Sequence, residues 1–337
     1  MSITSLPDDI EKINLSNKNL TCLPDLSRFY KLKNLDCSEN QLTSLPPFNL
    51  TLEIINCQSN QLTRLPAFNK KLQNIDCSFN RLLNLPSLNN NLKKLSCRNN
   101  CLTSLPQFNK KLKIVCCDNN RLTSLPPFNI NLQHVDCNYN CLTNLPMLNE
   151  NLIHLYCSDN LLTSLPILND KLLFLSCEFN QLTSLPSLNA SLKSLYCSSN
   201  LLTNIPLPST NLEFLFCHNN KLTGLPTLNK KLQELCCINN KLTSLPLLPP
   251  SLNKIYCFSN FIDYIIESFD AEIETIKNKI QILYNFRYSY YLLKFKKRFR
   301  DWLWVRVREP RIREKYSTAN LLKLLNENDL DEFLQNW

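Results

Sequence analysis

Residues 32–46, Leu-Lys-Asn-Leu-Asp-Cys-Ser-Glu-Asn-Gln-Leu-Thr-Ser-Leu-Pro, are the stretch that decides the fold. The same pattern returns every 20 residues without an insertion, with cysteine from Cys37 to Cys257, asparagine from Asn40 to Asn260 and proline from Pro46 to Pro246. A degenerate unit with a 22-residue step precedes these repeats. A fixed period of this length predicts a solenoid in which each repeat forms one coil.

The pattern within one repeat predicts the path of one coil. Leu35 and Cys37 should point inward around a short strand, while Asp36 points outward, because side chains alternate across a strand. Successive strands should then pair in parallel. The return segment cannot be helical, since Pro46 and Pro47 remove backbone donors and favour extended geometry. Because the sequence contains a single glycine, we expect the turns to rely on asparagine and proline.

Composition excludes several kinds of protein. Gly224 is the only glycine, whereas average usage would give roughly 24. Dinucleotide-binding, phosphate-binding and nucleophile-elbow motifs each need at least two glycines and are therefore absent. The sequence contains no apolar run of transmembrane length, and its acidic start does not resemble a signal peptide. We therefore expect the 17 cysteines to stay reduced inside a cell.

The repeat motif resembles the leucine-rich-repeat family, with cysteine in the third apolar position. The 20-residue unit is similar to the short repeats of bacterial secreted effectors and closer still to those of giant DNA viruses, and the resemblance covers residues 10–262. The tail stretches 309–316 and 330–337 are also similar to tails of such viral proteins. This resemblance implies a binding scaffold located in host cytoplasm or a virion. The ubiquitin-ligase domain of some effectors is disfavoured, because the last cysteine is Cys257.

The periodicity divides the chain into an N-terminal cap (1–9), a leucine-rich-repeat solenoid with a parallel sheet on its concave face (10–262) and an α-helical C-terminal segment (263–337). From residue 262 the apolar residues follow the 3/4 spacing of a helix. That helix should cover the open edge of the last coil and end at Pro310. Short helices should follow around Leu321 and Leu325 and over 330–337.

Functional information should lie in the columns that vary on the strand face. The column of Asp36 is acidic or small in the first half of the solenoid and largely aromatic in the second, and neighbouring columns follow the same trend. An exposed apolar surface of this kind usually marks a protein partner. The predicted partner-binding residues are Tyr139, Tyr156, Phe174, Phe179, Tyr196, Phe214, Phe216 and Tyr256. Alternatively, these rings pack on one another or are covered by the tail.

No catalytic, cofactor or metal site is predicted. His134 and His154 should lie one coil apart near Asp136, an arrangement able to hold a metal, but surface histidines are more often unrelated to metals. The cysteine and asparagine columns are better explained as core packing and turn formation. We therefore expect a non-enzymatic scaffold for a protein partner of unknown identity and unknown oligomeric state.

The positive charge of the chain is concentrated near its C-terminus. Residues 287–315 hold 11 Lys and Arg against 3 Asp and Glu, a net charge of +8 out of the total of +9. Basic residues interleaved with aromatic ones suit nucleic-acid phosphates or an anionic membrane. The alternative is the solvated face of a capping helix. The possible anion-binding residues are Lys294, Lys296, Lys297, Arg298, Arg300, Arg306 and Arg308.

Overall fold

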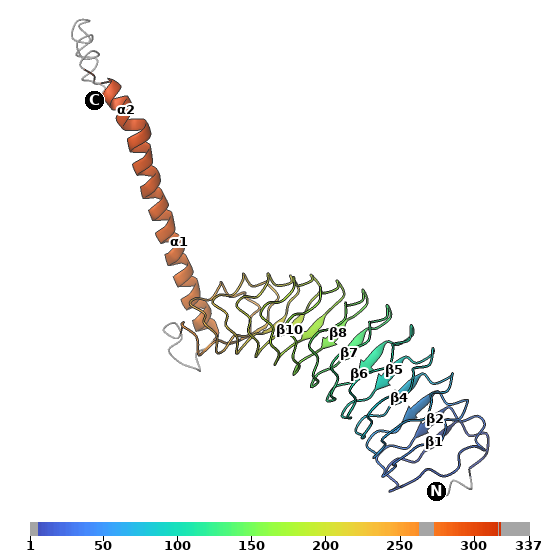
Figure 1. Ribbon diagram of the computed structural model, residues 1–337. Coiled ribbons are helices and arrows are strands. Elements are labelled where there is room, and N and C mark those ends of the chain that lie inside the picture. The colour runs from blue at the N-terminus through green and yellow to red at the C-terminus, as the bar shows by residue number, and fades with distance from the viewer. Residues whose placement is uncertain (1–5, 263–272, 316, 318–337) are drawn as a thin grey trace. The chain divides into compact units, whose positions relative to one another are not determined.

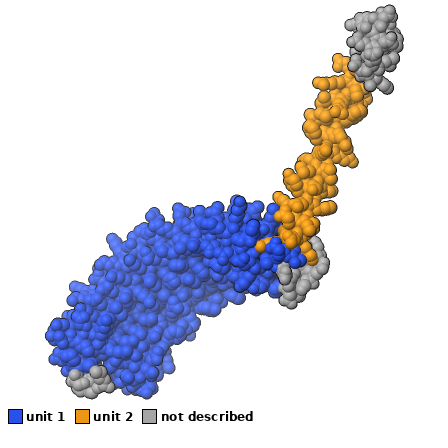
Figure 2. Space-filling model, turned by 180° about the vertical axis from the view of Figure 1, so that it is seen from behind, with its two compact units in different colours: residues 1–276 blue, residues 277–337 orange. Residues whose placement is uncertain are grey.

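The computed structural model describes residues 6–262, 273–315 and 317. The chain forms two compact units, Met1–Ile276 and Lys277–Trp337 (Figure 2). The first unit holds the repeats, and its internal contacts come from strands stacked one after another. No helix in the described part of the chain is long and apolar enough to cross a membrane.

Thirteen short strands form one parallel sheet on the concave face of the repeat unit, in the order β1 to β13 (Figure 1). Equivalent residues of successive repeats pair directly, as Leu35 does with Ile55. Each sequence column therefore becomes a row that runs across the sheet. The strands are β1 (Lys12–Asn14), β2 (Asn34–Asp36), β3 (Ile54–Asn56), β4 (Asn74–Asp76), β5 (Lys94–Ser96), β6 (Ile114–Cys116), β7 (His134–Asp136), β8 (His154–Tyr156), β9 (Phe174–Ser176), β10 (Ser194–Tyr196), β11 (Phe214–Phe216), β12 (Glu234–Cys236) and β13 (Lys254–Tyr256).

The core is a single column of apolar side chains that continues from coil to coil. The middle residue of each strand points inward, and so do the ladder cysteines, which are Cys37 and its equivalents at every twentieth residue up to Cys257. Leu45 and Phe48 of the return segment pack against this core from the opposite side. The predicted solenoid is thus confirmed. Since no coil covers its own apolar face, stability comes from the interfaces between neighbouring coils.

The ladder asparagines, Asn40 and its equivalents up to Asn260, tie each coil to the coil before it. In Asn60, Nδ2 donates to the carbonyl of Cys37 at 3.0 Å and to that of Cys57 at 3.2 Å, while Oδ1 accepts from the amide of Leu42 at 3.0 Å. The side chain therefore satisfies buried backbone groups in two coils, as the sequence predicted.

A second row of asparagines does the same on the return side. Nδ2 of Asn69 donates to the carbonyls of Asn49 and Leu52, and its Oδ1 accepts from the amides of Lys71 and Leu72. Most coils are thus held at two points by side-chain amides that replace missing backbone pairs, while Ser209 and Pro249 occupy this second position in two later repeats.

The prediction that asparagine and proline alone replace glycine was incomplete. The residue before every ladder asparagine has a positive φ, from Glu39 at 55° to Ser259 at 57°, and bulky residues such as Phe79, Tyr139 and Phe179 occupy this position. Gly224 does not have a positive φ. The coil therefore requires a left-handed backbone conformation at a position where most residues with a side chain disfavour it.

The second unit is mainly helical. Helix α1 (Ile273–Leu303) is followed by a π-helical turn, η3 (Trp304–Arg308), and by α2 (Glu309–Lys315). The predicted helix end at Pro310 was wrong, because Pro310 lies in the first turn of α2, where its missing N–H costs little. Inside a regular α-helix, a proline ring clashes with the carbonyl of the residue four positions earlier. The π turn directly before α2 changes the distance between Pro310 and that carbonyl. The helices predicted around Leu321 and Leu325 and over 330–337 lie outside the described residues, as do residues 1–5 of the predicted cap.

Candidate functional site

The strand-face aromatic residues form a continuous row on the sheet. The row contains six rings, and neighbouring rings contact each other across β7 to β11. Ring centroids are 4.6 Å apart between Tyr156 and Phe174, 5.2 Å between Phe174 and Tyr196, and 4.8 Å between Tyr196 and Phe216. The N-terminal end of the row is made by histidines, with 5.4 Å between His134 and Tyr156. We call this set the aromatic row: His134, His154, Tyr156, Phe174, Tyr196 and Phe216.

The rings of the aromatic row are half-buried, because each packs on its neighbours. Tyr196 and Phe216 are nearly parallel, with 11° between their planes. Stacking of this kind stabilises the rings and also fixes their orientation before any partner arrives. These residues were expected to be exposed, but they are half-buried, and the alternative in which the rings pack on one another describes the row.

Four of the predicted partner-binding residues lie outside the row. Tyr139 and Phe179 are 60% and 55% exposed, because they occupy the positive-φ position beyond the strand. Phe214 is half-buried on β11, and Tyr256 is exposed on β13. All four residues lie in sequence columns that contain other aromatic residues. Among the described residues, however, no ring contact joins them to the aromatic row.

A half-buried acidic pair lies beside the N-terminal end of the row. Arg98 Nε is 3.1 Å from Asp118 Oδ1, without a well-aligned hydrogen bond, and Arg98 Nη2 is 3.3 Å from Asp136 Oδ2. Burial and the charge of Asp136 raise the pKa of Asp118 to about 6, although Arg98 opposes this shift. One cation thus faces two carboxylates, and Asp118 takes up a proton at a higher pH than an ordinary aspartate does.

A second polar cluster lies near the C-terminal end of the row and was missed from the sequence. His218 Nδ1 is 2.8 Å from Ser198 Oγ and 3.6 Å from Cys236 Sγ, and Ser198 lowers the pKa of Glu178, which burial raises. Reading the column two residues after the strand would have brought Glu178, Ser198 and His218 together.

This cluster does not have the properties of a nucleophilic site. Burial raises the pKa of the Cys236 thiol and lowers the pKa of His218, so both groups are neutral near pH 7. An activated cysteine needs the opposite shift toward the thiolate. Within residues 6–262, 273–315 and 317, no group of three or more His, Cys, Asp or Glu side chains is arranged to hold a metal.

The ladder cysteines are free thiols in the core. Burial, followed by the charge of Asp36, raises the pKa of Cys37 to about 12, and burial also raises the pKa of Cys157 well above its ordinary value. Some thiols donate weak hydrogen bonds along the ladder, such as Cys137 Sγ to the carbonyl of Tyr156 at 3.1 Å. These residues act as small apolar side chains, and their thiol groups can also donate to a carbonyl group of the next coil.

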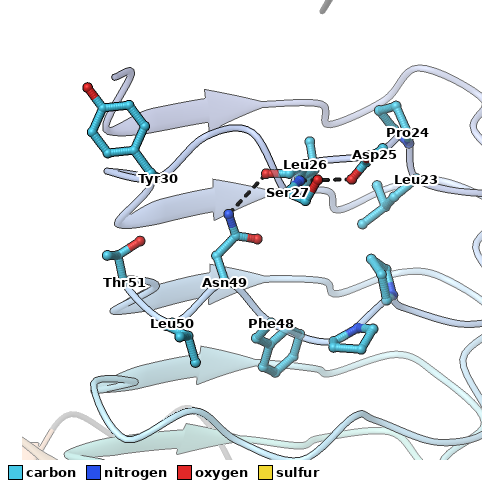
Figure 3. A pocket seen from close by; sticks show the side chains of 12 residues that line it. Leu23, Pro24, Asp25, Leu26, Ser27, Tyr30, Phe48, Asn49, Leu50 and Thr51 are labelled. Carbon is cyan, nitrogen blue, oxygen red and sulfur yellow. Dashed lines mark hydrogen bonds between the residues drawn. The ribbon is translucent and has the colours of Figure 1, made fainter. Parts of the chain in front are cut away.

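A pocket of about 870 Å³ opens between the return segments of the first two coils (Figure 3). Nδ2 of Asn49 donates to the carbonyl of Leu26 at 3.0 Å, and Asp25 Oδ1 accepts from the amide of Ser27. The pocket lies where the 22-residue step interrupts the period, and Asp25 is its only charged lining residue. It is lined by Leu23, Pro24, Asp25, Leu26, Ser27, Tyr30, Pro46, Pro47, Phe48, Asn49, Leu50 and Thr51. Its surface is mainly apolar and carries no catalytic set.

The predicted anion-binding residues lie on α1 and η3. Their side chains are exposed or partly exposed, and so are the aromatic residues between them, such as Phe295 and Trp302. Lys294 Nζ is 5.8 Å from the ring centroid of Tyr290, a cation–π contact within the helix. Basic and aromatic groups therefore share the helix surface.

Comparison with known proteins supports the repeat architecture. No protein-family model matches the chain, and no curated protein matches it. The leucine-rich effector protein YopM from Yersinia pestis is 34% identical, with a TM-score of 0.71 over 76% of this chain and 73% of that one. YopM from Yersinia enterocolitica WA-314 is 29% identical, with a TM-score of 0.64 over 74% of this chain, which spans only 65% of its length.

The ladder of cysteines also has a structural counterpart. The functional domain of InlJ from Listeria monocytogenes includes a cysteine ladder, and it is 25% identical to this chain. Its TM-score is 0.57 over 74% of this chain and 63% of the InlJ domain.

The parallel sheet, the 20-residue coil and these similarities define a repeat solenoid. The chain belongs to the leucine-rich-repeat family. Solenoids of this family are typically scaffolds for protein interaction, because stacked coils offer an extended concave surface without an enclosed cavity.

Proposed function

We propose that this protein is a non-enzymatic scaffold that binds a protein partner on its concave face, with the aromatic row at the centre of the interface. The observation that carries the proposal is the unbroken series of ring contacts from His134 to Phe216. Rigid aromatic side chains with one open face lose little conformational freedom on binding and dominate protein interfaces. Tyr139, Phe179, Phe214 and Tyr256 belong to the outer part of the same surface.

The test replaces Tyr156, Tyr196 and Phe216 together with serine and compares the proteins cross-linked to each form in native host cells. The matched control replaces three exposed apolar residues of the return segments, Leu50, Ile130 and Ile167, with serine. Both variants are first shown to be folded by circular dichroism. Loss of specific partners only from the first variant supports the proposal, whereas an unchanged set of partners contradicts it.

A second hypothesis is that the basic aromatic segment binds nucleic acid or an anionic membrane and the repeats act as an adaptor. It is favoured by the exposure of both residue types along α1, for example Phe295 at 66%. Binding of the full chain to RNA, DNA or acidic vesicles should weaken steeply as salt increases. Binding that persists after Lys294, Lys296, Lys297, Arg298 and Arg300 are replaced with glutamine would contradict this hypothesis.

The cellular setting remains a hypothesis as well. The resemblance to repeat proteins of giant DNA viruses and a reducing intracellular location are proposals that rest on the sequence. The free thiols of the ladder suit such a compartment. Alkylation of the protein as it is isolated from its native source, followed by mass spectrometry, tests whether the exposed thiols are reduced there.

A further inference from the structure

Carboxylates outnumber basic groups beside the aromatic row, where Arg98 pairs with Asp136 at one end and Lys254 is the sheet neighbour of Glu234 at the other. On the strand-face columns of the six coils from β7 to β12, the sequence places five acidic residues and a single basic one, Lys193. Lys193 Nζ lies 3.6 Å from Glu213 Oε1, so its charge is already paired. The acidic residues are Asp136, Asp159, Glu178, Glu213 and Glu234.

Tyr196 lies between two of these carboxylates. Its neighbour in the sheet is Ser176, and Glu178 follows Ser176 by two residues, on the same side of the chain. On the other side Tyr196 pairs with Phe216, which pairs with Cys236, two residues after Glu234. The charges of both Glu178 and Glu234 act on the Tyr196 hydroxyl, whose pKa is raised by burial and then by these carboxylates.

The Glu178 carboxylate forms no ion pair with any lysine or arginine that the structure describes. Its backbone amide donates to Ser158 Oγ at 3.0 Å, and burial raises the pKa of its carboxyl group. Within the described residues, no lysine or arginine forms an ion pair with Glu178 or with Glu234. A half-buried carboxylate next to aromatic rings gains a favourable interaction when a cation approaches, because the surroundings are less polar than water.

We propose that the partner segment recognised by the aromatic row is an extended, arginine-containing peptide whose guanidinium groups stack on Tyr196 and its neighbours and pair with Glu178 and Glu234. This inference rests on the proposed function and names the chemistry of the partner. A guanidinium is planar, so it covers a ring face and still donates two hydrogen bonds to a carboxylate. A lysine ammonium ion makes the charge contact without the planar stacking.

The same surface disfavours nucleic acid. Stacked rings suit bases, but a phosphate backbone along the row would lie beside Glu178 and Glu234, and these charges repel it. An extended peptide also fits the sheet, since its side chains alternate and those on one side can follow the row from coil to coil.

The experiment measures binding of fluorescein-labelled peptides to the full chain by fluorescence anisotropy. The main probe is a nine-residue peptide with three arginines at alternate positions separated by serine. The matched probes carry lysine or citrulline in place of arginine, and a decauridine oligonucleotide tests the nucleic-acid alternative. Citrulline keeps the shape of the side chain and removes its charge, so it isolates the role of the guanidinium ion.

We expect the arginine peptide to bind best and the citrulline peptide to bind at least about tenfold more weakly. The double variant Glu178→Gln and Glu234→Gln should weaken binding of the arginine peptide about tenfold, and Tyr196→Leu a few-fold. The control variant Glu39→Gln and Glu53→Gln, in the N-terminal coils, should leave binding unchanged. Equal binding of the arginine and citrulline peptides, or stronger binding of decauridine, overturns the proposal.

Failure of this inference is distinguishable from failure of the proposed function. If the triple serine variant of the aromatic row loses its cross-linked partners while the Glu178→Gln and Glu234→Gln variant keeps them, the row binds a partner that does not depend on arginine. If neither variant loses partners, the concave-face function itself is wrong. Loss of the same partners from both variants, together with selective binding of the arginine peptide, supports both.

Discussion

The side-chain amide of Asn160 donates to the carbonyl of Cys137 in the preceding coil at 3.0 Å. The same Nδ2 atom contacts the carbonyls of Cys157 and Ser158 in its own coil, and Oδ1 accepts from the amide of Leu142 at 2.9 Å. One buried side chain therefore satisfies backbone groups of two coils. The turn needs this arrangement because its backbone is too tightly curved to pair these groups directly.

Replacing Asn160 with alanine should destabilise the solenoid by about 2–4 kcal/mol, because several buried backbone groups lose their partners at once. The measurement is the urea midpoint of the transition followed by circular dichroism. The matched control is Asn144→Ala, since Asn144 is exposed on the return segment. An equal loss of stability in both variants would show that the ladder hydrogen bonds of Asn160 contribute no more to stability than an exposed asparagine does.

The left-handed residue before each ladder asparagine provides a second test, at Phe79, where φ is 54°. Phe79→Gly and Phe79→Ala remove the same exposed ring, but only glycine tolerates positive φ without a steric cost. We therefore expect the glycine variant to be more stable than the alanine variant by about 1 kcal/mol. Thermal unfolding of the two variants side by side measures the difference. A more stable alanine variant would contradict the left-handed geometry.

Much of this architecture was predictable because an uninterrupted period converts sequence columns into rows in space. The contacts of Tyr156, Phe174, Tyr196 and Phe216 follow from columns that differ by one or two strand positions. Column reading does not determine ring orientation, however. Phe214 shares the column of Phe174 and yet does not join the row, because the direction of a ring depends on its rotamer and its immediate neighbours.

The polar groups of the site were harder to predict. Asp118 and Asp136 occupy different columns in successive coils, and only their spatial approach shows that Arg98 holds both. Burial then determines which carboxylate keeps a proton, a property that the residue names do not reveal. The same holds for His218, whose role depends on Ser198 in the coil before it.

The acidic pair predicts a specific dependence on pH. The pKa of Asp118 in the folded protein is about 6, above its ordinary value of 3.8, so the folded state binds more protons between about pH 4 and pH 6. The stability of the folded state should fall as the pH rises through this range. Above it, the loss of stability caused by ionisation of Asp118 should be complete. The full shift corresponds to about 3 kcal/mol, and the interaction with Asp136 together with partial exposure reduces it to about 1 kcal/mol.

Asp118→Asn should therefore stabilise the protein by about 1 kcal/mol at pH 7.5 and have little effect at pH 4, because Arg98 keeps Asp136 as its partner. Urea unfolding at the two pH values measures this difference. Asp170→Asn, at an exposed position, is the control and should show no such dependence. Stabilisation that is the same at both pH values would mean that the effect does not arise from the proton.

The ladder thiols give a prediction about chemical reactivity. Cys22 and Cys141 are exposed and Cys101 is partly exposed, whereas the other 14 cysteines are buried. A thiolate is the reactive form, and burial both blocks access to Cys157 and raises its pKa. Brief treatment of the folded protein with iodoacetamide at pH 7.5 should therefore label Cys22 and Cys141 first, as mapped by mass spectrometry. All 17 cysteines should react in 6 M guanidinium chloride, which confirms that each thiol is free. Rapid labelling of Cys157 in the folded protein would show that the coils open on the timescale of the reaction, and it would contradict a closed core.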